Sequence, residues 1–111
     1  MAMGERDDTP ALHLGGALVE LHLPGVSSLK EKRSLVKPLI AALVNELGGS
    51  VAEVGWQDRW QRAALGIALA ASSASQLDRA LERLITLCER DPRVRVTKLV
   101  DTIDVVRSDD A

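Results

Sequence analysis

Cationic and aromatic side chains gather in two short segments of this sequence, Ser27–Arg33 and Gly55–Ala63. Lysine and arginine bind phosphate and carboxylate groups, and the free backbone amides at a helix N-terminus add positive potential for an anion. An exposed tryptophan can stack on a base of single-stranded nucleic acid. The candidate anion- or RNA-binding residues are Lys30, Lys32, Arg33, Arg59, Trp60 and Arg62.

Each of these positions also has a structural interpretation, which the sequence leaves open. Lys30, Arg33 and Lys37 share one flank of an expected helix, where they can form an ordinary solvated face. Glu53 and Asp58 are candidates for structural pairing, because each has a basic residue close by. The two tryptophans are more typical of a core edge or a protein interface than of a base platform, and we favour that interpretation for them.

Residue patterns typical of an enzyme or a metal centre are missing from the sequence. His13 and His22 are isolated from any cysteine cluster, and Cys88 falls in an apolar helical stripe, where it is expected to be a small core residue. No catalytic triad can be assembled from nearby positions, and no phosphate-binding glycine loop is present. We therefore expect a non-enzymatic domain that needs no metal and no cofactor.

Length and composition predict one domain with an aliphatic core. The chain has 111 residues, of which 46% are hydrophobic and only 2% aromatic. A single cysteine is typical of a reducing compartment, and no apolar run reaches the roughly 20 residues of a membrane helix, so a cytoplasmic location without membrane contact is expected. The expected organisation is an acidic tail over residues 1–11, a domain over 12–107 and an acidic tail over 108–111.

The distribution of charge bears on an RNA partner. The formal net charge is −2, but the two acidic tails carry −2 each, so the body between them carries −2 + 4 = +2. This balance is far weaker than that of most nucleic-acid-binding domains. Bulk charge alone neither supports nor excludes RNA or a ribosomal particle as the partner.

Hydrophobic periodicity predicts the element order β-α-β-β-α-β. Alternating apolar residues indicate strands, and apolar residues at helical spacing indicate two amphipathic helices. Ser28 with Glu31 three residues later is a capping box that opens the first helix. The expected strands cover residues 12–23, 50–55, 60–71 and 94–106, and the expected helices cover about 29–47 and 75–90.

Right-handed crossovers convert this order into a ferredoxin-like α+β sandwich, with an antiparallel sheet of strand order 4-1-3-2 and both helices on one face. The loop before the first helix and the hairpin between the second and third strands then lie at one end of the sheet. We expect an even hairpin register that places Glu53 opposite Arg62 on the open face, because a register that turned Glu53 toward the helices would bury a carboxylate. A phase shift in the last strand near Lys98 predicts a bulge.

The open face of the sheet is expected to be smooth and apolar. Its predicted interface residues are Leu18, Ala64, Gly66 and Ala68. An RNA-recognition domain of this topology would carry aromatic residues in the middle of that face, and none is present. A homodimer or another protein partner is the alternative that this face favours.

Two groups of motifs carry a family resemblance. Leu21-His22-Leu23-Pro24-Gly25 with Ser28-Leu29-Lys30-Glu31-Lys32-Arg33, and Val51-Ala52-Glu53-Val54 with Asp58-Arg59-Trp60-Gln61-Arg62-Ala63, resemble the YlxP-like family of bacterial proteins. The resemblance covers about residues 18–106 and implies a ferredoxin-like fold. Members are often encoded beside genes for ribosome maturation and translation initiation, which implies work near RNA by association. The family supplies no catalytic residues.

Overall fold

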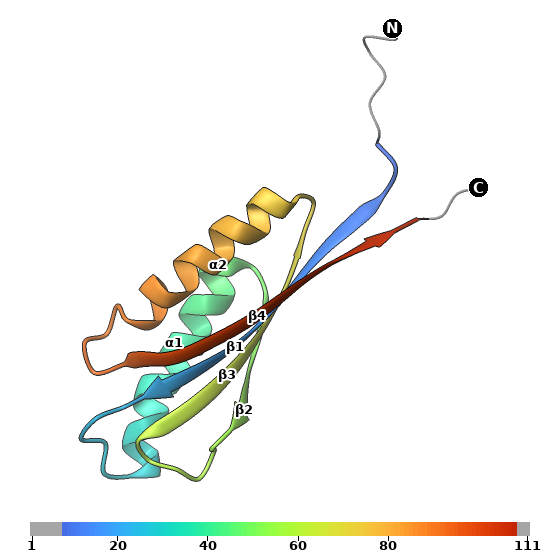
Figure 1. The fold of residues 1–111 in the computed structure, drawn as a ribbon. Coiled ribbons are helices and arrows are strands. Elements are labelled where there is room, and N and C mark those ends of the chain that lie inside the picture. The colour runs from blue at the N-terminus through green and yellow to red at the C-terminus, as the bar shows by residue number, and fades with distance from the viewer. Residues whose placement is uncertain (1–7, 109–111) are drawn as a thin grey trace, which may run out of the picture.

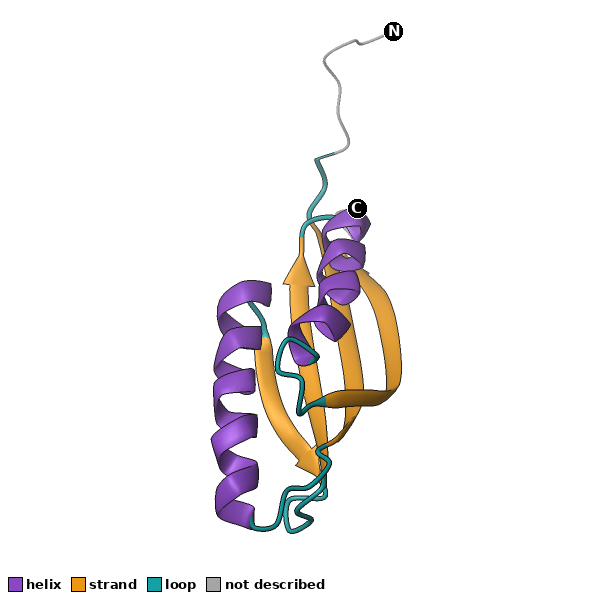
Figure 2. Cartoon of the chain, turned by 90° about the vertical axis from the view of Figure 1, so that its left-hand side faces the viewer, coloured by secondary structure: helices purple, strands orange, loops and turns teal. Residues whose placement is uncertain are grey.

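Two helices cover one face of a four-stranded antiparallel sheet (Figures 1 and 2). The computed structural model describes residues 8–108; the predicted tails lie largely outside this range. The strand order is β2-β3-β1-β4. The elements are β1 (Ala11–His22), α1 (Leu29–Leu47), β2 (Ser50–Gly55), β3 (Arg62–Ala71), α2 (Ala74–Cys88) and β4 (Arg95–Arg107). The predicted ferredoxin-like fold is therefore confirmed.

The core between the sheet and the helices is aliphatic, as the composition predicts. Val19 and Leu21 of β1 and Leu65 of β3 are fully buried, and Leu43 of α1 and Leu84 of α2 meet them from the helix layer. Alternate residues of each strand point to this core, while their neighbours point to the open face. The burial of such side chains contributes roughly 1.5–3 kcal/mol each to stability.

Helix α1 begins at the predicted capping box. The Ser28 side chain accepts a hydrogen bond from the Glu31 backbone amide at 3.0 Å. The Glu31 carboxylate in turn accepts from the amide and the hydroxyl of Ser27, both at 3.1 Å. At the other end, Gly48 takes the left-handed conformation with φ of 74°, and its amide bonds to Val44. The contacts of Ser27 and Ser28 fix where the helix starts relative to the end of β1, and Gly48 fixes where it ends.

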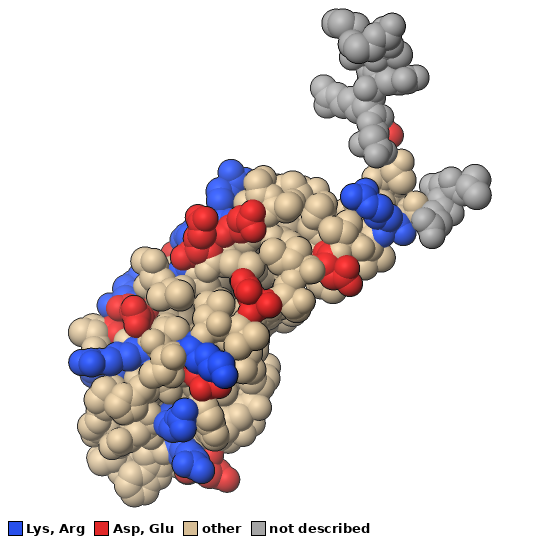
Figure 3. Space-filling view, in the orientation of Figure 1, with Lys and Arg blue, Asp and Glu red and all other residues tan. Residues whose placement is uncertain are grey.

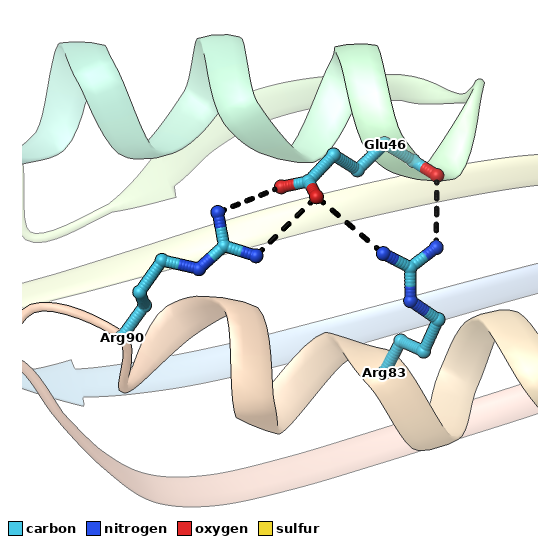
Figure 4. A network of polar contacts seen from close by, with 3 residues as sticks. All are labelled: Glu46, Arg83 and Arg90. Carbon is cyan, nitrogen blue, oxygen red and sulfur yellow. Dashed lines mark hydrogen bonds and ion pairs between the residues drawn. The ribbon is translucent and has the colours of Figure 1, made fainter.

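The C-terminal half of α1 is joined to α2 and to the turn that follows α2 by one carboxylate (Figure 4). Glu46 forms ion pairs with Arg83 at 3.4 Å and with Arg90 at 3.1 Å. The Glu46 backbone carbonyl also accepts from Arg83 at 3.4 Å, which satisfies a carbonyl in the last turn of α1. Both arginines are largely exposed, so these ion pairs contribute little to the free energy of folding. Their main effect is on how the two helices are oriented.

The predicted register of the β2–β3 hairpin is wrong. Glu53 pairs with Leu65 and not with Arg62, and a bulge falls between Glu53 and Gly55. Glu53 therefore points to the helix side of the sheet, where the Lys32 ammonium lies 3.8 Å from its carboxylate. A carboxylate on the helix side is costly when it is unpaired, but here the buried Lys32 cation of α1 is its partner.

The predicted bulge in β4 is confirmed. The pairing of β1 with β4 shifts between Glu20 and Leu21, which lie opposite Lys98 and Val96. Thr97 is left over between these pairs, and its hydroxyl donates to the Glu20 carbonyl at 3.1 Å. Beyond this point β1 and β4 continue as a long pair toward the two termini (Figure 1).

Replacing Ser28 with alanine should lower the free energy of unfolding by about 1 kcal/mol, because the Glu31 amide loses its acceptor. Chemical denaturation of the variant and the wild type measures the loss. Ser34→Ala is the control, since Ser34 lies inside α1, where alanine has the better helix propensity. Equal stability of Ser28→Ala and the wild type would show that the helix start does not depend on this cap.

Candidate anion-binding end of the sheet

The loop before α1 and the β2–β3 loop are joined by hydrogen bonds. The Leu23 amide donates to the Gln61 carbonyl at 2.9 Å. The Gln61 side-chain amide donates to the Val26 carbonyl at 3.3 Å. The two segments therefore lie side by side at one end of the sheet, as the topology predicts. We call the exposed residues Lys30, Arg33, Arg59, Trp60 and Arg62 at this end the basic end.

Lys32 is not part of the basic end, which corrects its prediction as an anion-binding residue. Its side chain is only 2% exposed. Its ammonium donates to the Trp56 carbonyl at 2.7 Å and to the Gln57 carbonyl at 3.4 Å, with Glu53 beside it. Burial lowers the pKa of Lys32, and the carboxylates of Glu53 and Asp58 partly offset this effect. Lys32 is therefore a clamp on the β2–β3 loop and is not available to a partner.

The loop that Lys32 holds has an unusual backbone. Trp56 has a φ of 56°, in the left-handed region that side-chain-bearing residues seldom adopt. The Arg62 guanidinium lies over the Trp56 ring, 3.8 Å from its centroid, and pairs with Glu20 at 3.7 Å. Arg62 therefore holds the ring of Trp56, and the hydrogen bond from Lys32 holds its carbonyl. Together these contacts keep Trp56 in its strained conformation.

The remaining cations of the basic end are exposed. Within residues 8–108, Lys30, Arg33 and Arg59 form no ion pair. Lys37, one helical turn beyond Arg33, is exposed and unpaired in the same sense. Trp60 is 51% exposed at the tip of the hairpin. The predicted cluster thus consists of three unengaged cations, one exposed ring and Arg62, which is partly engaged.

Two hollows flank the hairpin. One, of about 340 Å³, lies between α1 and β2, and its lining includes Arg33, Lys37 and Asp58. The other, of about 460 Å³, lies beneath the hairpin tip, and its lining includes His22, Arg59 and Trp60. Each hollow is bordered by cations and by the Asp58 carboxylate, so an anionic group of a larger ligand would have to bind on the cationic side.

The two predicted pairing residues differ in their contacts. Glu53 has a structural partner, but the partner is Lys32 and not Arg62. Asp58 is exposed and acts on Lys32 through its charge without forming an ion pair in the described part of the chain. An acidic residue at this end moderates the positive potential of the neighbouring cations.

The open face differs in part from its prediction. Leu18 is 37% exposed and Ala68 is exposed, but Ala64 is only 6% exposed, which corrects its prediction as an interface residue. The bulge in β2 brings Gly55 opposite Ala64 and covers it. Sequence reasoning missed Val54 and Val100, both 50% exposed, because bulges in the two edge strands set which way these side chains point.

The described residues include one buried thiol and no cluster of metal-ligating side chains. Burial raises the pKa of the Cys88 thiol to about 11, so the nucleophilic thiolate is scarce at neutral pH. Over residues 8–108 no three His, Cys, Asp or Glu side chains gather in an arrangement that could hold a metal ion. Neither described helix combines the length and the apolar character that crossing a membrane would require.

Residues 14–100 match the model of a family described as a protein of unknown function (DUF503). The chain is 34% identical over 84 residues to the uncharacterized protein YlxP of Bacillus subtilis (strain 168), an alignment that covers 76% of this chain and 91% of YlxP. The chain therefore belongs to the DUF503 family, which confirms the resemblance drawn from the sequence motifs.

Solved structures with the same general architecture are more distant. A dimeric ferredoxin-like protein from an uncultured marine organism is 17% identical, with a TM-score of 0.45 over 90% of this chain and 91% of that chain. A protein described as an antibiotic biosynthesis monooxygenase from Chloroflexus aurantiacus J-10-fl is 15% identical, with a TM-score of 0.49 over 86% of this chain and 96% of that chain. Likeness at this level carries no conclusion about activity or assembly.

Replacing Lys32 with methionine should lower the free energy of unfolding by about 3 kcal/mol, because the Trp56 carbonyl and the Glu53 carboxylate lose their partner. The double variant Lys32→Met/Glu53→Leu should recover at least about 1 kcal/mol of that loss, since no charge is then left unpaired. Denaturant unfolding of the two single variants and the double variant completes the cycle. Lys37→Met, on the exposed face of the same helix, is the control and should change stability by less than about 0.5 kcal/mol. Additive losses would show that Lys32 and Glu53 act independently.

Proposed function

We propose that this protein is a non-enzymatic binding domain whose basic end holds a phosphate-rich partner, with RNA, free or within a ribosomal particle, as the partner class. One observation carries the proposal: Lys30, Arg33 and Arg59 are exposed without an acidic partner in residues 8–108, although two separate segments supply them. Unengaged cations from different elements on one surface are typical of polyanion binding.

The support of the surface from behind strengthens the proposal. The buried Lys32 clamp and the Gln61 bridge fix the hairpin relative to α1, so binding would cost little additional ordering of the backbone. The N-terminus of α1 adds positive potential near Lys30. Trp60 adds an exposed ring on which an unpaired base can stack.

The same charges limit the affinity. Three unengaged cations neutralise few phosphates, which corresponds to a slope of about −2 in a plot of log affinity against log salt for single strands. Asp58 lies beside them and opposes further anion binding. We therefore expect weak binding to free RNA and stronger binding only where a ribosomal particle supplies additional contacts.

Replacing Lys30 and Arg33 with glutamine should weaken RNA binding and make the salt slope shallower by about 1.4, since two phosphate contacts are lost at about 0.7 each. A fluorescence titration with single-stranded RNA at several salt concentrations measures both. The matched control is Arg79→Gln/Arg107→Gln, which removes the same charge from exposed positions on α2 and β4. An unchanged salt slope in the first variant, or equal losses of RNA affinity in both variants, would show that Lys30 and Arg33 belong only to a solvated helix face.

The open face favours a second candidate function, self-association. Of the ten large apolar residues that are exposed in residues 8–108, six lie on this face. They are Leu12, Leu14, Leu18, Val54, Val100 and Val106. An exposed apolar surface of this extent is typical of a protein interface and costs solubility in a monomer.

Light scattering should find the wild type as a dimer at high protein concentration, and Ala68→Glu should shift it toward the monomer, because a charge then lies in the middle of the open face. Ala41→Glu introduces the same side chain on the exposed face of α1 and should leave the mass unchanged. A dimer of equal strength in both variants would exclude the open face as its interface.

A further inference from the structure

The open face has the size and the relief of a surface that packs against its own copy. Four strands at about 4.8 Å spacing and up to about 40 Å long give an area on the order of 700 Å², close to the roughly 800 Å² that each partner contributes to a stable interface. Figure 3 shows that most of this surface of the molecule is uncharged, with single charged residues scattered over it.

Two charges on this face are separated along β4. Asp104 lies opposite Leu14, and Lys98 lies opposite Glu20, so both side chains point to the open face. The two residues are six positions apart, a separation of about 20 Å along an extended strand, and so they cannot pair within one copy. Neither forms an ion pair in the part of the chain that the structure describes. Asp104 accepts the amide of its neighbour Val105, and Arg62 engages the Glu20 that lies beside Lys98.

The point midway between these charges falls at Ala17, which lies opposite Asp101. Toward β2 the open face is hollow around this point. A depression of about 400 Å³ is lined mainly by small residues, among them Gly16, Gly66 and Ala68. Toward β4 the face protrudes, because Leu18 and its neighbour Val100 project from adjacent strands.

Building on the proposed self-association, we infer that two copies pack open face to open face about a twofold axis that passes near Ala17, in the plane of the interface and across the strands. This operation places Asp104 of each copy against the partner's Lys98. It also places Leu18 of each copy over the partner's Gly16, which lines the hollow. A twofold contact needs a surface that is complementary to itself, and both the charges and the relief meet this requirement. The two basic ends then lie at opposite ends of the dimer, so one dimer presents two separate anion-binding surfaces.

Charge reversal tests this arrangement. Dissociation constants from analytical ultracentrifugation at low salt are compared for the wild type, Asp104→Lys, Lys98→Asp and the double variant. Each single variant should weaken the dimer about tenfold or more, because two like-charged contacts form per dimer, and the double variant should return to within about threefold of the wild type. Asp101→Lys is the matched control, because Asp101 lies on the same strand but on the helix side, and it should leave the dissociation constant unchanged.

The outcomes separate this arrangement from self-association in general. A wild type that stays monomeric at the highest concentration overturns both. The wild type can instead be a dimer while the double variant loses as much affinity as the two single losses multiplied together. That result overturns the twofold arrangement but not self-association. Thermal unfolding of each variant identifies any loss of folding, and a folded Asp104→Lys variant that dimerises as well as the wild type also overturns the arrangement.

Discussion

The Lys32 ammonium is the contact on which the end of the sheet depends. It reaches from α1 to the carbonyls of Trp56 and Gln57 and lies beside the Glu53 carboxylate. Taking an ammonium group out of water is costly. The two carbonyls and the carboxylate around the Lys32 ammonium offset this cost, so the group remains charged. The result is a helix and a hairpin that cannot move independently. The exposed cations of both elements are therefore held in one arrangement.

The fold could be predicted from the sequence because each of its determinants is local. The alternation of β1, the apolar stripes of the helices and the Ser28 cap each depend on a few neighbouring residues. Handedness rules then leave one strand order. The bulge in β4 was also predictable, since the apolar pattern changes phase near Lys98. The juxtaposition of the two basic segments followed from the topology alone.

The hairpin register could not be predicted, because it depends on a contact between residues far apart in the chain. Glu53 on the helix side is unfavourable by every local criterion and becomes acceptable only when Lys32 of α1 is beside it. The same contact withdraws Lys32 from the binding surface, and the accompanying bulge covers Ala64. One unforeseen ion pair thus accounts for the wrong register, for the withdrawal of Lys32 from the binding surface and, through the bulge, for the covered Ala64.

Hydrogen exchange tests the central role of Lys32 most directly. The amide of Arg59, which donates to the Trp56 carbonyl at 2.9 Å, and the amide of Leu23, which donates to Gln61, report on the order of the joined loops. We expect slow exchange at both amides in the wild type and much faster exchange in Lys32→Met, with the amides of β1 inside the sheet less affected. Unchanged protection of Arg59 and Leu23 in that variant would show that the end of the sheet is ordered without the Lys32 clamp.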